Sequence, residues 1–169
     1  MRYGYLVPPR SKREIFDLAA KVRKPFAAMI GDRGFVPIAQ AYEVMHLMLP
    51  GFEFEVCDRA ELGDDHGQTF PNKRLIKLRE DVYAGMCAGS GRDRFTAAHE
   101  LGHLFMHSGV RFSRADPNAK PFLNSEWQAD NFASAFLIDE RLLSRCKSVS
   151  EVQEAFGVSN HAAMVRYKK

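Results

Sequence analysis

The feature that most constrains this chain is a group of polar residues inside an otherwise apolar predicted helix, the segment His-Glu-Leu-Gly-His at 99–103. Residues four apart lie one turn apart on nearly the same helix face, so both imidazoles can point toward one ion while the carboxylate flanks them. Apolar residues cover both sides of the predicted helix from about Arg94 to His107, which is typical of a buried helix. Two histidines and a glutamate are costly to bury without partners, so the fold must supply partners for them.

Zinc is the partner that this pattern favours. Neutral imidazole suits Zn²⁺, and a catalytic zinc usually has three protein ligands and one open position. We expect one Zn²⁺ per chain, held by His99 and His103, with Glu100 as the base that takes a proton from the attacking water. The alternative is a pair of hydrogen-bonded core histidines with a glutamate paired to an arginine. Gly102 costs about 1 kcal/mol relative to alanine inside a helix, and either close approach of a second helix or ordinary packing would explain it.

The third ligand has to come from another part of the chain. The extended motif H-E-x-x-H-x-x-G-x-x-H is excluded, because Met106 and Gly109 occupy the positions where it needs glycine and histidine. His107 lies further round the helix, and we expect it near the C-terminal carbonyl groups. Glu126 and Asp130 are four residues apart at the start of the next apolar helix, so we predict that Glu126 binds the metal and Asp130 accepts a hydrogen bond from a ligand histidine. Alternatively, the two acids only favour the N-terminal end of that helix.

The remaining pattern predicts an α+β fold, a small sheet of about three strands packed on a helical layer that carries the His99–His103 helix. Strands are expected at 52–56, 67–71 and 74–78, and the segment 111–123 is expected to be irregular. Helices are expected at 11–24, 37–49, 82–88, 94–107, 125–138, 140–145, 149–156 and 160–167. Pro25 is expected to mark a break or a second helical start.

Composition and length favour one domain over residues 1–169, with a helical extension at 1–36 and a C-terminal helical hairpin at 148–169. The net charge of +3 is too small to indicate nucleic-acid binding by itself. Three widely spaced cysteines favour reduced thiols in a cytoplasm. The start of the chain does not read as a signal peptide, and the longest apolar helical stretch falls well short of the roughly 20 residues of a membrane span, so we expect no membrane contact.

Two segments resemble a known family. Residues 94–107, Arg-Phe-Thr-Ala-Ala-His-Glu-Leu-Gly-His-Leu-Phe-Met-His, are similar to the core motif of the ImmA/IrrE family of zinc metallopeptidases, and residues 126–133 are similar to its second motif. The resemblance implies a zincin-like fold, His99, His103 and Glu126 as zinc ligands, and Glu100 as the general base. At Asp130 the family often has asparagine, and aspartate there is similar to the thermolysin-type gluzincins.

The resemblance also implies a partner. Family members commonly act in prophages, mobile elements and stress responses, where they cleave or inactivate a helix-turn-helix regulator or an antitoxin-type protein. No regulator domain is evident between Arg10 and Leu49, so we expect a separately encoded protein substrate. An extended peptide could add to the predicted strand at 67–71. The stabiliser of the transition state is not identified, although Tyr83, His66 and His161 are candidates.

Two other functions stay open. The C-terminal helices could form a DNA-binding helix-turn-helix, with a turn at 155–159 and basic residues at Arg166, Lys168 and Lys169. We do not expect direct nucleic-acid binding, because the charge supplies little attraction. We expect these helices to pack on the core through Val152, Phe156, Val158, Ala162 and Val165. Alternatively, the chain is a non-catalytic zinc-containing binding protein, which would survive Glu100→Gln unchanged.

Overall fold

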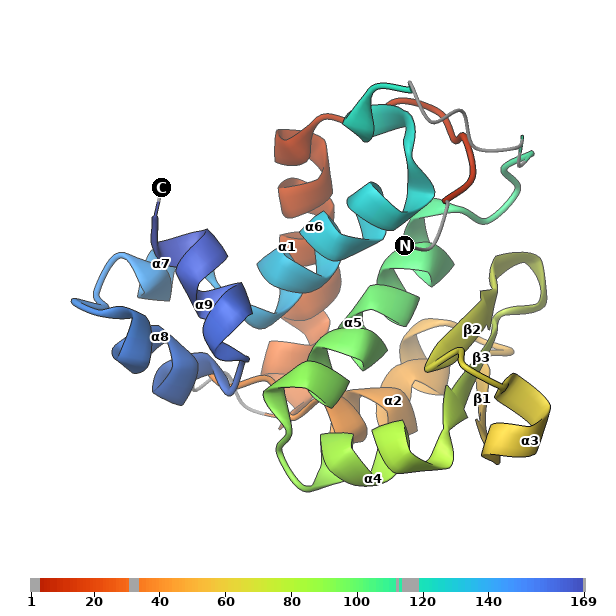
Figure 1. The fold of residues 1–169 in the computed structure, drawn as a ribbon, viewed down its shortest axis with the longest axis horizontal. Helices are drawn as coiled ribbons and strands as arrows, with labels where there is room; N and C mark the ends of the chain where they lie inside the picture. Colours follow the sequence, from red (N-terminus) through yellow and green to blue (C-terminus); the bar gives the residue numbers. More distant parts are fainter. Residues whose placement is uncertain (1–3, 31–33, 112, 114–118, 169) are drawn as a thin grey trace.

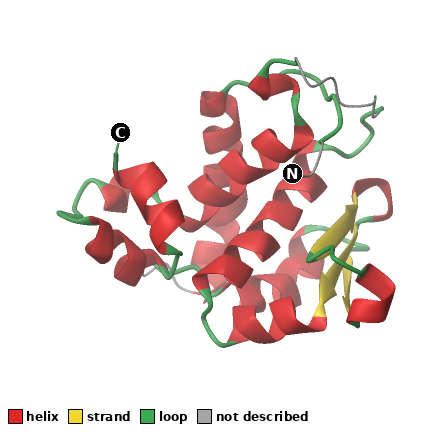
Figure 2. Cartoon of the chain, in the orientation of Figure 1, coloured by secondary structure: helices red, strands yellow, loops and turns green. Residues whose placement is uncertain are grey.

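The computed structural model describes residues 4–30, 34–111, 113 and 119–168 of the chain. In these residues helices predominate, and a three-stranded sheet lies at one side of the helical layer (Figures 1 and 2). The predicted α+β class is therefore confirmed. No helix in the described ranges is long and apolar enough to cross a membrane.

The centre of the fold is a pair of packed helices, α5 (Gly91–Met106) and α6 (Ser125–Leu137) (Figure 1). They approach closely at Gly102, where an added Cβ atom would lie only 3.1 Å from the Cα atom of Ala129. Close approach of a second helix is thus the reason for a glycine inside α5. Ser90 caps the start of α5 through the backbone N–H of Asp93, so the helix begins three residues before its predicted start.

The sheet has the order β1–β3–β2, from β1 (Glu53–Cys57), β2 (Gly67–Phe70) and β3 (Leu75–Arg79). β2 and β3 lie at two of the predicted strand positions and form an antiparallel hairpin through the short 3₁₀ helix η1 (Pro71–Lys73), whereas β1 pairs with β3 in parallel. A short helix α3 (Arg59–Leu62), which the sequence pattern did not predict, lies in the crossover. β2 packs against α5 and forms one edge of the sheet.

Helix α1 (Lys12–Ile30) packs along α6 and runs through Pro25 without a break, so the prediction of a break there was wrong. A proline removes one helical hydrogen bond, but packing beyond it can compensate. Phe26 is fully buried and meets Phe136 of α6 edge to face at a centroid distance of 6.2 Å. Helices α2 (Ile38–Met48) and α4 (Glu80–Cys87) complete the layer around α5.

The C-terminal part consists of α7 (Glu140–Leu143), α8 (Val149–Phe156) and α9 (Asn160–Tyr167), which gather at the side of α5 and α6 opposite the sheet (Figure 1). Arg94 of α5 fixes the turn between α8 and α9 by donating hydrogen bonds to the carbonyl oxygens of Gly157 and Phe156 at 2.8 and 3.1 Å. Four of the five residues predicted to pack inward are buried: Val152, Phe156, Val158 and Ala162.

The fifth, Val165, was predicted wrongly, because its exposed fraction is 55%. Arg166, which would be a DNA contact in the helix-turn-helix hypothesis, is instead 2% exposed. Helical periodicity explains why Arg166 is buried and Val165 is not. The inward face of α9 carries Ala162, Ala163 and Arg166. The predicted irregular segment 111–123 includes residue 112 and residues 114–118, which lie outside the described residues, and ends in the 3₁₀ helix η2 (Pro121–Leu123).

Candidate metal centre

Three side chains from α5 and α6 bring their electron pairs to one point. The Nε2 atoms of His99 and His103 lie 3.0 Å apart, and the carboxylate oxygens of Glu126 lie 3.4 Å from His99 Nε2 and 3.3 Å from His103 Nε2. A tetrahedral zinc with bonds of about 2.0 to 2.1 Å places its ligand atoms about 3.3 Å apart. The three side chains therefore have the spacing of a metal-binding group, with one ligand atom from each within 4.8 Å of the others.

The orientation of His99 is fixed from behind by Asp130, one turn after Glu126 on α6. His99 Nδ1 lies 2.8 Å from Asp130 Oδ1. A carboxylate oxygen accepts, so Nδ1 carries the hydrogen and the neutral ring has its free electron pair on Nε2. Asp130 thereby presents His99 in the tautomer that a metal needs.

A longer hydrogen-bond chain does the same for His103. The amide Nε2 of Gln128 donates to the carbonyl oxygens of Pro8 and Phe122 at 2.9 and 2.8 Å, which fixes the orientation of the amide. Gln128 Oε1 then accepts from His107 Nε2 at 3.1 Å, and His107 Nδ1 accepts from His103 Nδ1 at 3.0 Å. His103 is left with its electron pair on Nε2, facing Glu126.

This chain of hydrogen bonds requires a neutral His107, and the surroundings of the ring favour the neutral form. Burial lowers the pKa of His107 to about 4, with a smaller contribution from the charge of His103. His107 is the C-cap residue of α5, at the C-terminal end of the helix as predicted. Its ring is 1% exposed and reaches Gln128, a contact that the sequence pattern did not indicate. The rotation around α5 that takes His107 away from the metal ligands points its ring at α6.

The converging electron pairs need a cation between them. Two imidazole nitrogens and a carboxylate that share no proton repel one another at these distances. A proton on His99 is one way to remove this repulsion. Burial alone would lower the pKa of His99, but its hydrogen bonds to Asp130 and Glu126 outweigh burial and raise the pKa to about 10. The pKa of Glu126 lies well below its usual value, because hydrogen bonds to the two histidines outweigh burial. A divalent metal satisfies the same group without protonating a ligand.

Glu100 of α5 lies beside this group, and its side chain is in contact with residues of β2. Thr69 of β2 donates its hydroxyl hydrogen to Glu100 Oε2 at 2.6 Å, and the side chain of Glu100 passes directly over Gly67. An added Cβ atom at Gly67 would lie 2.9 Å from Glu100 Cγ, so only glycine leaves this carboxylate in place. Glu100 is 2% exposed and still lines the cleft described next.

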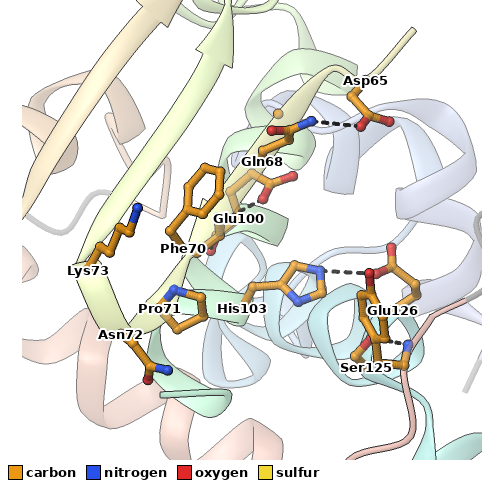
Figure 3. A pocket seen from close by; sticks show the side chains of 13 residues that line it. Asp65, Gln68, Phe70, Pro71, Asn72, Lys73, Glu100, His103, Ser125 and Glu126 are labelled. Atoms are coloured by element: carbon orange, nitrogen blue, oxygen red, sulfur yellow. Dashed lines mark hydrogen bonds and ion pairs between the residues drawn. The ribbon is translucent and has the colours of Figure 1, made fainter. Parts of the chain in front are cut away.

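A cleft of about 650 Å³ opens over these residues. Figure 3 shows Glu100 and His103 between the strand segment that carries Gln68 and Phe70 and the helix end that carries Glu126. One wall of the cleft is therefore β2 and η1, and the other is the start of α6. An extended molecule could lie between the two walls, directly over Glu100, His103 and Glu126.

The N-terminal segment completes the second wall. Tyr5 lines the cleft, and its backbone is fixed on both sides by Ser125: Tyr5 N donates to Ser125 Oγ at 2.9 Å, and Ser125 N donates to Tyr5 O at 3.0 Å. Gly4 lies against Glu126, where an added Cβ atom would come 2.8 Å from Glu126 Cγ. Asn124 caps α6 through the backbone N–H groups of Glu126 and Trp127. The third candidate ligand is thus positioned by the helix cap and by residues near the N-terminus.

Comparison with known families gives this geometry a context. A model of the peptidase family M78, described as the IrrE N-terminal-like domain, matches residues 52–168. The chain belongs to this family. A search of curated proteins found no significant match. The M78 family is a family of metallopeptidases, and its matched region contains α5, α6 and the sheet.

The M78 match begins after α1 and α2, so Tyr5 and the rest of the N-terminal wall lie outside the matched region. The sequence did not indicate Tyr5, Thr69 or Gln128 as parts of the site, because nothing in the local pattern shows which distant residues they contact. Of the three proposed stabilisers, Tyr83 stacks on Phe54, His66 contacts Arg92, and His161 is on α9. None of the three lines the cleft described above.

Proposed function

We propose that this chain is a zinc-dependent peptidase with one Zn²⁺ bound by His99, His103 and Glu126. The observation that supports this most directly is the convergence of two imidazole nitrogens and a carboxylate, with one ligand atom from each within 4.8 Å of the others and both imidazole Nδ1 positions already used. Membership of the M78 family supports peptidase activity. The donor set of two imidazoles and one carboxylate fits zinc, which commonly uses such a set at catalytic sites.

In this proposal zinc supplies Lewis acidity, which polarises the scissile carbonyl and makes water easier to deprotonate. Glu100 takes a proton from the water that attacks the carbonyl carbon and then passes it to the departing amine nitrogen as the C–N bond breaks. Thr69 keeps the carboxylate of Glu100 oriented by donating a hydrogen bond to it. Asp130, His107 and Gln128 act at a distance by keeping the ligand histidines in the required tautomer.

We further propose that the substrate is an extended segment of another protein. β2 is an edge strand that lines the cleft, so its free edge could pair with a peptide backbone while Glu100 and His103 lie beneath the scissile bond. The resemblance to the ImmA/IrrE family favours a separately encoded helix-turn-helix regulator or antitoxin-type protein as this substrate. Cytoplasmic location, a single domain and one zinc per chain are parts of the same proposal.

Co-expression with proteins encoded next to this chain tests the proposal. Wild type should convert one neighbour to a fragment, and Glu100→Gln should leave all neighbours intact while binding one zinc per chain by metal analysis. Glu154→Gln, an exposed change on α8 that lies outside the cleft, is the matched control and should cleave like wild type. Cleavage that persists in zinc-loaded Glu100→Gln would refute the role of Glu100.

The non-catalytic alternative makes the opposite prediction. A zinc-containing binding protein would associate with a neighbour without cleaving it, and Glu100→Gln would bind that neighbour as tightly as wild type does. The DNA-binding alternative has less support than the sequence suggested, because burial removes Arg166 from the surface of α9.

A further inference from the structure

The cleft over the candidate metal ligands differs in charge between its two ends. Figure 3 shows Asn72 and Lys73 toward one end and Asp65 toward the other, with Glu100 between them. Among the described residues that line the cleft, Lys73 is the only lysine or arginine. Because protein walls focus the field of such a charge, Lys73 can select the part of a substrate that lies beside it.

The ammonium group of Lys73 is held over an aromatic ring. Its Nζ atom lies 5.6 Å from the centroid of the Phe70 ring, whose face attracts a cation. No carboxylate in the described part of the chain forms an ion pair with Lys73, and the side chain is exposed. An anionic group that enters the cleft therefore reaches the ammonium without displacing a carboxylate.

Asn72 adds a neutral donor with a fixed orientation. Gly109 N donates to Asn72 Oδ1 at 2.7 Å. Only the oxygen of an amide accepts from an N–H group, so Nδ2 carries both hydrogen atoms and points away from Gly109. Asn72 is exposed and lines the cleft next to Lys73. This end of the cleft thus offers a cation and two N–H groups of an amide.

The turn that carries these donors is held on both sides. Gly109, which follows α5, binds Asn72 on one side. On the other side, Arg74 donates a hydrogen bond to the carbonyl oxygen of Pro50. Arg74 also ends η1 in the left-handed conformation, with a φ of 54°. A turn held in this way loses little conformational freedom when a ligand binds to it.

We propose that Phe70, Asn72 and Lys73 form a specificity site for an aspartate or glutamate side chain of the substrate protein, an inference that rests on the proposed peptidase function. The carboxylate of the substrate accepts hydrogen bonds from Lys73 Nζ and Asn72 Nδ2. Hydrogen bonds of a carboxylate to an ammonium group are stronger than those between neutral groups. The methylene groups of the acidic side chain contact the Phe70 ring.

The direction of β2 predicts on which side of the scissile bond the acidic residue lies. Gly67 at the start of β2 lies against the side chain of Glu100, whereas Lys73 lies beyond the end of the strand. A peptide that pairs with β2 in the more stable antiparallel direction passes Lys73 before it reaches Glu100. The acidic residue therefore lies on the N-terminal side of the bond that is cut.

Digestion of a peptide library prepared from a whole proteome tests this preference. The zinc-loaded, full-length chain is incubated with the library, and mass spectrometry identifies the new ends. Aspartate and glutamate should be enriched about threefold on the N-terminal side of the cut bonds, as expected for an exposed ion pair. Lys73→Glu should abolish the enrichment, because the attraction becomes a repulsion.

Lys120→Glu is the matched control. Lys120 is also exposed and lies over a phenylalanine ring, 5.9 Å from the centroid of Phe122, but it does not line the cleft. The variant has the same change of charge as Lys73→Glu and should keep the wild-type preference. Melting temperatures of the two variants check that both are folded.

A binding measurement makes the test independent of cleavage. Zinc-loaded Glu100→Gln is titrated with an end-blocked peptide of alternating glutamate and valine, and with its glutamine–valine counterpart as the neutral control. The glutamate peptide should bind more tightly and shift the NMR amide signals of Phe70 and Lys73. Lys73→Glu in the same background should weaken its binding by about tenfold, whereas Lys120→Glu should not.

The outcomes separate the specificity site from the peptidase function. Cleavage without an acidic preference on the N-terminal side, or equal binding of the two peptides, would overturn the specificity site and leave peptidase activity standing. An unchanged preference or affinity in Lys73→Glu would also overturn it. Glutamate-selective binding that depends on Lys73, with no cleavage of any peptide, would support the site and count against the peptidase function.

Discussion

In the proposed metal centre, single residues outside the three candidate ligands orient the two histidines. Asp130 accepts the hydrogen bond from His99 Nδ1 at 2.8 Å and so holds the ring in the productive tautomer. Asp130→Ala should lower zinc affinity by about tenfold to hundredfold, as is usual when such a partner is removed. Competition with a chromophoric chelator measures this affinity. Asp17→Asn on α1, outside the cleft, is the control, and equal affinity in both variants would exclude a role for Asp130.

His107 offers a sharper residue-scale prediction, because the sequence pattern did not indicate its contacts. His107→Leu removes the acceptor for His103 Nδ1 and leaves Gln128 Oε1 without its donor. Zinc affinity should fall by about tenfold or more, while His107→Gln, which can still accept a hydrogen bond, should retain most of it. Melting temperatures measured with and without zinc separate this effect from lost packing. Equal zinc affinities for the two variants would contradict the proposed hydrogen-bond chain.

At the scale of elements, the close contact between β2 and α5 positions Glu100. Gly67→Ala places a Cβ atom 2.9 Å from Glu100 Cγ, and a flexible side chain gives way more easily than a strand does. The variant should therefore fold and bind zinc normally but cleave more slowly, by about tenfold to hundredfold, since small displacements of a catalytic group are costly. Rate, zinc content and melting temperature are the measurements. A slower rate accompanied by a loss of zinc would indicate a disturbed metal centre instead.

Elements with regular periodicity were predictable, and long-range pairings were not. Amphipathic spacing located α2, α6, α8 and α9 within a few residues, because their buried faces recur every three to four positions. The parallel pairing of β1 with β3 was not predicted, since it depends on a crossover through α3 and β2. The break predicted at Pro25 is absent from α1 because the burial of Phe26 against α6 is a tertiary interaction that outweighs the local effect of proline.

For the whole molecule, the first residues of the chain should matter as much as the motif at its centre. Deletion of residues 1–10 removes the paired hydrogen bonds between Tyr5 and Ser125, the acceptor Pro8 O for Gln128, and the buried side chain of Val7. Zinc affinity and melting temperature should both fall, because each buried hydrogen bond contributes about 1 kcal/mol and Glu126 loses its neighbour.

Tyr5→Ala is the matched control for this deletion, since it removes a half-exposed side chain and keeps the backbone hydrogen bonds. It should bind zinc nearly as well as wild type. Calorimetric titration with zinc and thermal unfolding followed by circular dichroism measure the two quantities. A deletion variant that binds zinc like wild type would show that the N-terminal segment is dispensable for the metal centre.

The sequence by itself determined the chemical groups of the candidate site: two imidazoles and a carboxylate on one buried helix, and an acidic pair at the start of the next. It could do so because helical periodicity fixes which residues four apart share a face. Only the tertiary structure decided how that chemistry is oriented, through Thr69 on Glu100, His107 and Gln128 behind His103, and Tyr5 beside Ser125. These contacts join residues 21 to 120 positions apart or depend on how far α5 rotates toward α6, and no local pattern encodes such distances or rotations.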